Sequence, residues 1–189
     1  MAGSIRVAGH TIAEHDIVND KVDIQNATLD SSVTFPAGSV LQVVHTETSE
    51  TNILDSTYTN YYEVPLTLKS NSSDVIVTFT FNYNMGNTMG FGVKIYRSNS
   101  AVVTTSDTAV WTKNGANSTG PFTIYYTGIS SMYGVSSITG KDTLTGLNAG
   151  DTIYYGLFAR RYQTDDTIAF PTNATEDGFF SSLIMEVQK

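Results

Sequence analysis

The chain of 189 residues contains no cysteine, which excludes disulfides, thiolate metal ligands and thiol catalysis together. Charged residues make up only 15% of it, against a usual share of roughly 25%. Ten lysines and arginines stand against eighteen acidic residues, so the net charge is −8 at pH 7. Nucleic acids and anionic membranes attract clustered lysines and arginines. We therefore expect neither as a partner.

Long apolar runs are also missing. No stretch approaches the about 20 apolar residues of a membrane-spanning helix, so we expect no membrane insertion. The first residues, Met1–Arg6, lack the apolar stretch of a signal peptide, which predicts synthesis in a cytoplasm.

The motifs of common active sites are absent as well. The sequence has no G-x-S-x-G, no P-loop and no G-x-G-x-x-G that follows a strand. His10, Glu14 and His15 stand in an order that matches no zinc-protease pattern, and His45 lies far away. We expect no catalytic residue, cofactor or metal, although three copies of an arm histidine around a trimer axis would be able to share an ion.

Acidic pairs are the remaining enzymatic candidates. Asp165, Asp166, Glu176 and Asp177 fall between the last two expected strands. Two carboxylates can hold Ca²⁺ or act as the acid and base of a glycosidase. Carboxylates in the loops of an acidic protein are usually solvated, so a non-enzymatic protein is the preferred interpretation and a glycan-cleaving enzyme the alternative.

What the chain has in abundance is threonine, serine and asparagine, which make up almost a third of it. This composition favours strands joined by turns over helices. The clearest strand covers residues 75–83, where Val75, Val77, Phe79, Phe81 and Tyr83 alternate with polar residues. A glycine-rich turn connects it to residues 91–97, so the pair is predicted to form a hairpin.

The rest of the pattern predicts an all-β protein. Residues 46–60 read as a long exposed loop, residues 130–140 as irregular, and Pro65 places its strand at a sheet edge. The spacing of the strands predicts an antiparallel β-sandwich, with a jelly roll as the preferred topology. The other expected strands are residues 39–45, 61–68, 101–104, 109–112, 122–127, 152–162 and 179–187.

Two domains are expected, an extended N-terminal arm (residues 1–34) and the sandwich (residues 35–189). Apolar residues are sparse in the arm, and no helical period connects them, although residues 11–20 would allow a short helix. Ile5 with Val7, and Val22 with Ile24, alternate as in extended segments that pair with something else. The arm is either a partly disordered tail or a segment ordered by neighbouring subunits.

Exposed aromatic residues are the candidate contact sites. Tyrosines in or beside the expected loops can stack on sugars or become buried in subunit contacts. A core or interface role is the simpler interpretation, and glycan binding is the alternative. These tyrosines are Tyr58, Tyr61, Tyr62, Tyr125, Tyr126, Tyr133 and Tyr162.

One stretch carries a family resemblance. The segment V-T-F-P-A-G-S-V-L-Q-V-V, residues 33–44, resembles an element that opens the C-terminal β-sandwich of fibre and appendage proteins of tailed bacteriophages. Asn71–Asp74 before Val75 looks like a later element of these proteins. Thr143-Leu144 and Ala149–Thr152 look like their last hairpin. The resemblance covers about residues 33–187, and its motifs are short and structural.

The resemblance implies a structural protein of a phage virion, made in the host cytoplasm. The short N-terminal part would suit a short tail fibre or fibre-like appendage, with a capsid decoration (cement) protein as an alternative. A homotrimer is expected, anchored to other virion proteins through residues 1–34, with a host-surface glycan as a possible target. A carbohydrate-binding module unconnected with a virion is the other alternative.

Overall fold

A computed structural model describes residues 4–7, 10–16, 21–23, 35–49, 52–85, 90–111, 122–125, 132–162, 168–171 and 178–189. For the first three of these ranges, for residue 111 and for residues 122–125, it describes the backbone. Every regular element in these ranges is a β-strand, and no helix in them has the length and apolarity to cross a membrane. The chain divides into two compact units, Met1–Phe35 and Pro36–Lys189.

The N-terminal unit is a small antiparallel sheet. It contains β1 (Ser4–Val7), β2 (His10–Asp16) and β3 (Lys21–Asp23), with β2 in the middle. The extended conformation expected around Ile5 and Val22 is confirmed, but both strands pair with β2 of the same unit. The short helix expected from residue 11 is wrong at least as far as Asp16, since these residues belong to β2.

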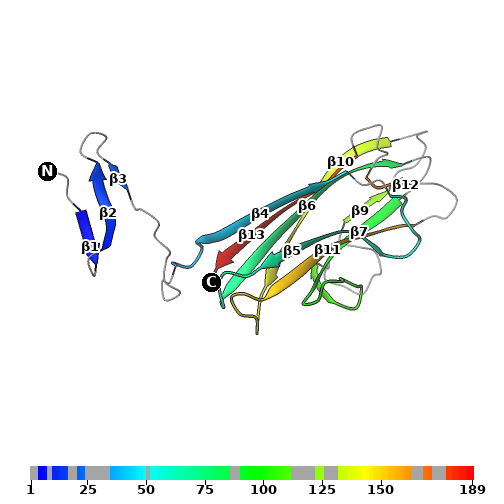
Figure 1. Cartoon of the computed structure of the whole chain (residues 1–189). Coiled ribbons are helices and arrows are strands. Elements are labelled where there is room, and N and C mark those ends of the chain that lie inside the picture. Colours follow the sequence, from blue (N-terminus) through cyan, green and yellow to red (C-terminus); the bar gives the residue numbers. More distant parts are fainter. Residues whose placement is uncertain are drawn as a thin grey trace. The chain divides into compact units, whose positions relative to one another are not determined.

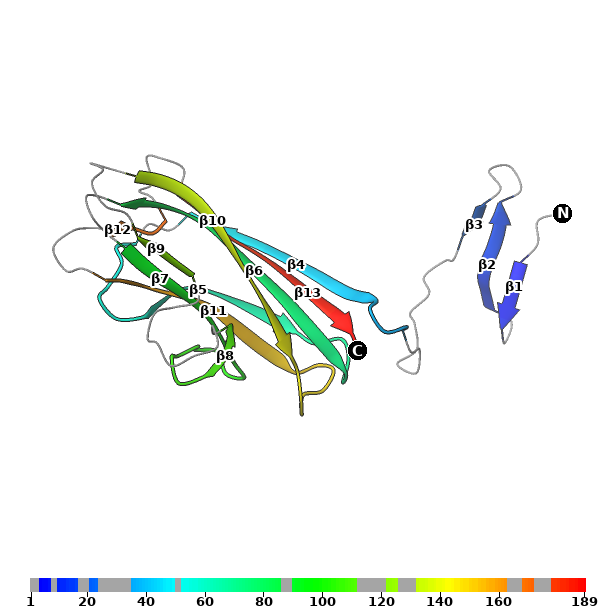
Figure 2. The ribbon, with the colours of Figure 1, turned by 180° about the vertical axis from the view of Figure 1, so that it is seen from behind.

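The larger unit is a β-sandwich of two antiparallel sheets, as predicted. Figures 1 and 2 show the two layers from opposite sides. The β13 sheet has the order β10-β6-β13-β4, with β12 beside β6, and the β11 sheet has the order β5-β11-β7-β8, with β9 beside β7. The β13 sheet consists of β4 (Val40–Thr48), β6 (Ser73–Met85), β10 (Met132–Thr143), β12 (Ile168–Ala169) and β13 (Phe180–Gln188). The β11 sheet consists of β5 (Thr59–Thr67), β7 (Gly90–Ser98), β8 (Thr108–Trp111), β9 (Phe122–Tyr125) and β11 (Thr152–Arg161).

Successive strands mostly change sheet. The chain runs from β4 to β5, from β6 to β7 and from β10 to β11 by passing from one sheet to the other, and its last long strand, β13, pairs with β4 and β6. The jelly-roll topology stays a prediction. The expected hairpin between residues 75–83 and 91–97 is wrong, because β6 and β7 belong to opposite sheets.

The two sheets meet through the apolar faces that the sequence predicts. On β6, Val75, Val77, Phe79, Phe81 and Tyr83 are all buried. From the facing sheet, the ring of Phe91 approaches Phe81 and Tyr83 edge-on, with centroids 6.4 and 5.0 Å apart. Full burial of such a side chain stabilises the fold by about 1.5–3 kcal/mol. The apolar faces of β6 and β7 therefore pack against each other across the core.

The larger unit begins with a turn. Residues 36–38 form it, Ser39 donates a backbone hydrogen bond to Pro36 at 3.1 Å, and Gly38 has a φ of 87° that favours glycine. Pro65 lies in β5, an edge strand of the β11 sheet, as predicted.

Three local expectations are wrong. Residues 132–140 belong to β10, a strand of 12 residues, and are not irregular. Residues 101–104 form no strand; they lie in a loop over the β11 sheet in which Val103 is buried. The expected loop at 46–60 is shorter, since β4 extends to Thr48, and it contributes Leu54, which is 1% exposed, to the core.

Candidate functional site

The predicted tyrosines separate into groups with different surroundings. Tyr61 and Tyr62 lie on β5 and pack against the core. The Tyr61 hydroxyl accepts a hydrogen bond of 2.8 Å from the backbone N–H of Asp55, and burial raises the pKa of Tyr61. The Tyr62 ring stacks on Phe180 with centroids 5.6 Å apart. These two tyrosines therefore stabilise the fold and present no platform to a ligand.

Tyr58 and Tyr162 come together on the outer face of the β11 sheet. Both hydroxyls lie over Gly92 of β7: a Cβ there would be 2.2 Å from the Tyr162 Oη and 2.7 Å from the Tyr58 Oη. Only glycine leaves room for both hydroxyls. Gly92 is the register partner of Arg160 on β11, which brings the guanidinium to the same spot.

Two cations complete this group. The Lys94 Nζ lies 4.3 Å from the centroid of the Tyr58 ring, and the Arg160 Cζ lies 4.8 Å from it. The Arg160 Cζ is also 5.2 Å from the centroid of the Tyr162 ring. Cation–π contacts of this kind contribute about 0.5–1 kcal/mol at exposed sites. We call these five residues, Tyr58, Gly92, Lys94, Arg160 and Tyr162, the tyrosine–cation cluster.

The cluster has a clear chemical character. Two positive charges and two phenolic groups gather at one place on a chain of net charge −8. All four side chains are half-buried, so part of each faces solvent. Guanidinium and ammonium groups bind carboxylates and sulfates, and tyrosines bind the hydroxyls and apolar faces of sugars. The cluster is thus suited to a negatively charged, hydroxyl-rich ligand.

The structure describes the other three predicted tyrosines to different extents. Tyr133 is on β10, 55% exposed. It belongs to the β13 sheet, so it does not join the cluster. Tyr125 is in β9, with its backbone alone described, and Tyr126 lies outside the described residues. Asp165, Asp166, Glu176 and Asp177 also lie outside them.

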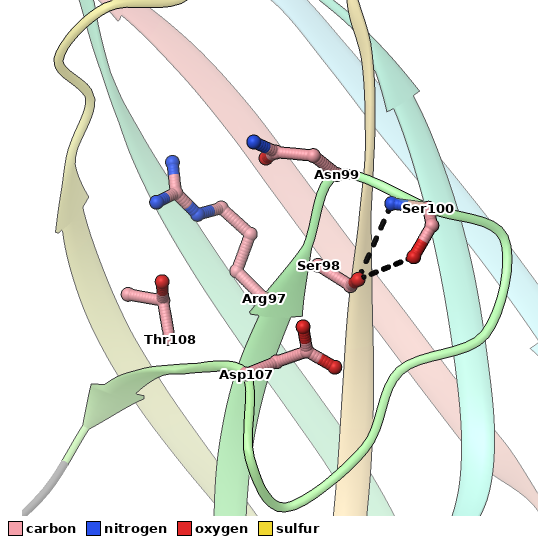
Figure 3. A pocket seen from close by; sticks show the side chains of 6 residues that line it. All are labelled: Arg97, Ser98, Asn99, Ser100, Asp107 and Thr108. Atoms are coloured by element: carbon pink, nitrogen blue, oxygen red, sulfur yellow. Dashed lines mark hydrogen bonds between the residues drawn. The ribbon is translucent and has the colours of Figure 1, made fainter.

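A small polar hollow of about 280 Å³ lies near the end of β7, between Arg97–Ser100 and Asp107–Thr108. Figure 3 shows that the side chains of Arg97 and Asp107 point to different sides of it. Asp107 accepts from the backbone N–H and the hydroxyl of Thr104 at 2.7 and 2.8 Å, and these bonds lower its pKa. Among the described residues that line the hollow, Asp107 is the one carboxylate, and it is held by its own loop, so they contain no acid–base pair.

The Arg97 guanidinium extends toward the opposite sheet. Its Nε lies 3.3 Å from Oδ2 of Asp142 on β10, and Tyr155 of β11 donates a hydrogen bond of 3.0 Å to the same oxygen. Burial raises the pKa of Asp142, although Arg97 opposes this shift. Burial also raises the pKa of Tyr155, and the nearby Asp142 adds to the effect. This buried group connects the two sheets and is closed to a large substrate.

Glu186 of β13 is a second buried carboxylate that the sequence pattern missed. It is fully buried and accepts hydrogen bonds from the backbone N–H groups of Lys69, at 2.9 Å, and Ser70, at 3.1 Å. The hydroxyl of Ser73 and the amide of Gln42 also donate to it. These bonds hold the turn before β6 against β13, so Glu186 has a structural role.

Metal ligands do not gather in the described part of the chain, where no three His, Cys, Asp or Glu side chains come together. His45 is exposed on β4, beside Ser181 at 3.1 Å and Glu47 at 3.3 Å. His10 and His15 lie in or beside β2, where the backbone alone is described. An ion shared by three copies of an arm histidine in a trimer stays a prediction.

No signal in the sequence indicated the two cations of the cluster. Lys94 and Arg160 stand at polar positions of alternating strands, where most charged residues are simply solvated. The register between β7 and β11 brings them to the two tyrosines. That register is a tertiary property.

No protein-family model matches the chain, and no curated protein matches it. Among solved structures, it is similar to dimeric latent PorU from Porphyromonas gingivalis, with 10% identity and a TM-score of 0.36 over 87% of this chain and 14% of that one. A Bacillus endospore appendage protein has 13% identity and a TM-score of 0.32, over 86% of this chain and 100% of that one. The Gx strain of infectious bursal disease virus has 8% identity and a TM-score of 0.33, over 87% of this chain and 38% of that one. No conclusion about function rests on likenesses this low.

Proposed function

We propose that the chain is a non-enzymatic structural protein of a bacteriophage virion, a trimeric short tail fibre or fibre-like appendage. One observation carries the proposal: the boundary between the two units, at Phe35 and Pro36, falls inside the segment of residues 33–44 that resembles the opening of phage appendage β-sandwiches. An attachment unit followed by a projecting sandwich is the organisation that such a protein needs.

The size of the N-terminal unit supports an attachment role. Its three strands have only 4, 7 and 3 residues. A sheet of three strands this short is near the lower limit of what is stable by itself in water. A partner surface on another virion protein would supply the missing contacts, which is the role proposed for residues 1–34.

Particle assembly tests this proposal. Particles are assembled with the full chain or with a chain that lacks residues 1–34, and the incorporated protein is measured by quantitative mass spectrometry. We expect the truncated chain to be absent from particles while its thermal unfolding matches that of the sandwich in the full chain. Incorporation of the truncated chain at the full level would contradict the attachment role.

The number of copies separates the two virion locations. A fibre attached at one end is expected in a few tens of copies per particle or fewer. A capsid decoration protein, the alternative, covers a lattice and would be present in hundreds. The same mass-spectrometric measurement on particles with the full chain decides between them.

The tyrosine–cation cluster favours a second function, the binding of a host-surface glycan. Because Lys94 and Arg160 flank the tyrosines, the glycan should carry carboxylates or sulfates. An array of acidic and neutral glycans, probed with the protein and with its Lys94→Gln variant, tests this. We expect acidic glycans to bind the protein and to lose most of that binding in the variant.

The matched control for this experiment is Lys141→Gln, which removes an equally positive group from the other sheet. Equal losses in both variants would indicate a general charge effect and contradict a site at the cluster. Binding to acidic glycans together with no incorporation into any particle would favour the carbohydrate-binding module unconnected with a virion.

A further inference from the structure

The outer face of the β13 sheet carries most of the exposed apolar residues of the described chain. In the described chain, eight large apolar side chains are exposed, and five of them belong to strands of the β13 sheet. These five are Val40, Val43, Tyr133, Val135 and Leu183. We call the outward surface of this sheet the outer β13 face.

The apolar residues form continuous rows across the strands. Val43 of β4 is the register partner of Met185 on β13, which in turn pairs with Ile76 of β6. Ile76 and Met185 are half-buried by their neighbours alone. Tyr133 and Val135 form a second apolar area on β10.

Between the two apolar areas lies a row of hydroxyl groups. The Oγ1 atoms of Thr78 and Thr139 are 2.9 Å apart, and the Thr80 Oγ1 is 2.7 Å from the Ser137 Oγ. These hydroxyls already have partners on the neighbouring strand. In each pair one hydroxyl donates to the other, so covering the row costs less than covering hydroxyls that have no partner.

Few charges occupy this face. Asp74 forms ion pairs with Lys141 at 2.7 Å and with Lys189 at 3.5 Å, and the Lys141 bond lowers the pKa of Asp74. Apart from these ion pairs, the described ionisable groups on β4 are His45 and Glu47. Two copies of a chain with a net charge of −8 repel each other. A face nearly free of net charge is where they can approach.

The area of the face is adequate for such a contact. Four strands about 4.8 Å apart, with about nine residues at about 3.3 Å each, span roughly 600 Å² in projection. Protruding side chains raise the accessible area toward the about 800 Å² that each partner buries in a standard interface.

We propose that the outer β13 face is the surface through which one copy of this chain binds another. This inference rests on the proposed trimer, for which it supplies the contact surface. The occupant is a second copy, because the face combines apolar residues, paired hydroxyls and little net charge, so that chains of net charge −8 can approach one another there.

Charge insertion tests the proposal. Val43 and Val135 are 55% and 63% exposed, so V43E and V135E should leave the isolated sandwich folded. The control is V102E: Val102 is 69% exposed in the loop over the other sheet. The mass of each full-length protein is measured by light scattering over micromolar concentrations, and thermal unfolding verifies the fold.

We expect the parent protein and V102E to be trimers. V43E and V135E should each associate at least about 10-fold more weakly, because a carboxylate would be buried without a partner, and should approach the monomer mass of 20.5 kDa. A parent trimer that V43E and V135E leave intact would overturn the inference but not the proposed function. A parent monomer throughout would overturn the inference and the trimer, and leave the particle experiment to test the attachment.

A second measurement covers the case in which a variant fails to fold. The chain has no cysteine, so Thr139→Cys or Val102→Cys provides a single site for a polarity-sensitive fluorophore. On raising the protein concentration, we expect a blue shift at position 139, on the edge strand β10 of the outer β13 face, and none at position 102. No shift at position 139 while the protein associates would contradict the inference.

Discussion

The two sheets of the sandwich share one core but differ on their outer faces. The β11 sheet is covered by its own chain: the loop after β7 places Val103 on Tyr96 and Phe158, and the tyrosine–cation cluster occupies the same face. No described segment of the sandwich covers the apolar side chains of the β13 sheet in this way. Both sheets have the same pattern of apolar residues on their inner faces. The residues on the outer faces therefore decide which sheet is covered by other parts of its own chain.

The largest difference is expected for Phe158→Ala. Phe158 is buried on the covered face, and its ring meets Tyr96 edge-on at 5.0 Å. Removing a buried ring lowers the free energy of unfolding by about 3–5 kcal/mol. On the outer β13 face, Leu183→Ala should lower it by less than about 1 kcal/mol in the monomer, because this side chain is already exposed. Urea unfolding measures both, and equal losses would contradict the comparison.

A smaller loss is expected at the bond that holds the covering loop. The Glu63 Oε2 accepts from the backbone N–H of Val103 and from the Asn60 amide, each at 2.9 Å. Glu63→Ala leaves these donors unpaired and should cost about 1–3 kcal/mol of unfolding free energy. It should also speed amide hydrogen exchange at Val103. Glu63→Gln keeps an acceptor, so exchange there should change less, and equal exchange in both variants would contradict this role of the bond.

The buried Asp142 connects the two sheets and predicts a pH effect. Because its pKa is raised in the folded protein, its contribution to stability is fully present below its usual value of 3.8 and is lost as the pH rises through the folded-state pKa. The unfolding free energy of the parent minus that of Asp142→Asn should therefore fall as the pH rises from about 3.8. Urea unfolding at a series of pH values measures this difference.

Asp74 provides the control of opposite sign. Its pKa is lowered by Lys141, so its contribution to stability is present above its usual value of 3.8 and is lost as the pH falls through the folded-state pKa. The difference between the parent and Asp74→Asn should thus decrease toward acid pH. If both differences changed in the same direction, the two assigned environments would be wrong.

The smallest effect is expected in the hydroxyl row of the outer β13 face. Thr78→Val removes one partner of the Thr139 hydroxyl but keeps the shape and the β-branch of the side chain. Since the row is exposed in the monomer, the unfolding free energy should change by no more than about 0.5 kcal/mol. In the trimer, the unpaired Thr139 hydroxyl would be covered, so association should weaken. Thermal unfolding of the monomer and light scattering of the trimer measure the two effects.

The sequence predicted the strands whose inward residues are large. On β6 and β11, alternation alone identified Val75, Phe79, Ile153 and Leu157 as core residues, because the side-chain period of a strand is local. It missed β10, whose inward positions include Gly134 and Gly140. The space under Gly134 is filled from β6: a Cβ there would lie 2.3 Å from the Tyr83 Oη. A small residue opposite a large one leaves no apolar pattern in its own strand.

The sequence named Tyr58, Tyr61, Tyr62 and Tyr162 alike as candidate contacts, and that role stays a prediction. Their surroundings differ: Tyr58 and Tyr162 meet Arg160, whereas Tyr61 and Tyr62 pack against the core between the sheets. The neighbouring residues in the sequence do not distinguish these pairs. Which ring turns inward depends on the register shift where β5 pairs with β11, between Leu157 and Phe158.

By itself, the sequence determined an all-β sandwich, the inward faces of its longest strands, the turn at Gly38 and the edge position of Pro65, because composition, alternation and backbone preference act within a few residues. Only the tertiary structure decided that β6 and β7 face each other across the core, that Gly92 lies under two tyrosines and that Glu186 and Asp142 are buried. These features depend on which strands share a sheet and in which register. Both result from the packing of the whole core, so no single segment of the sequence contains the information that determines them.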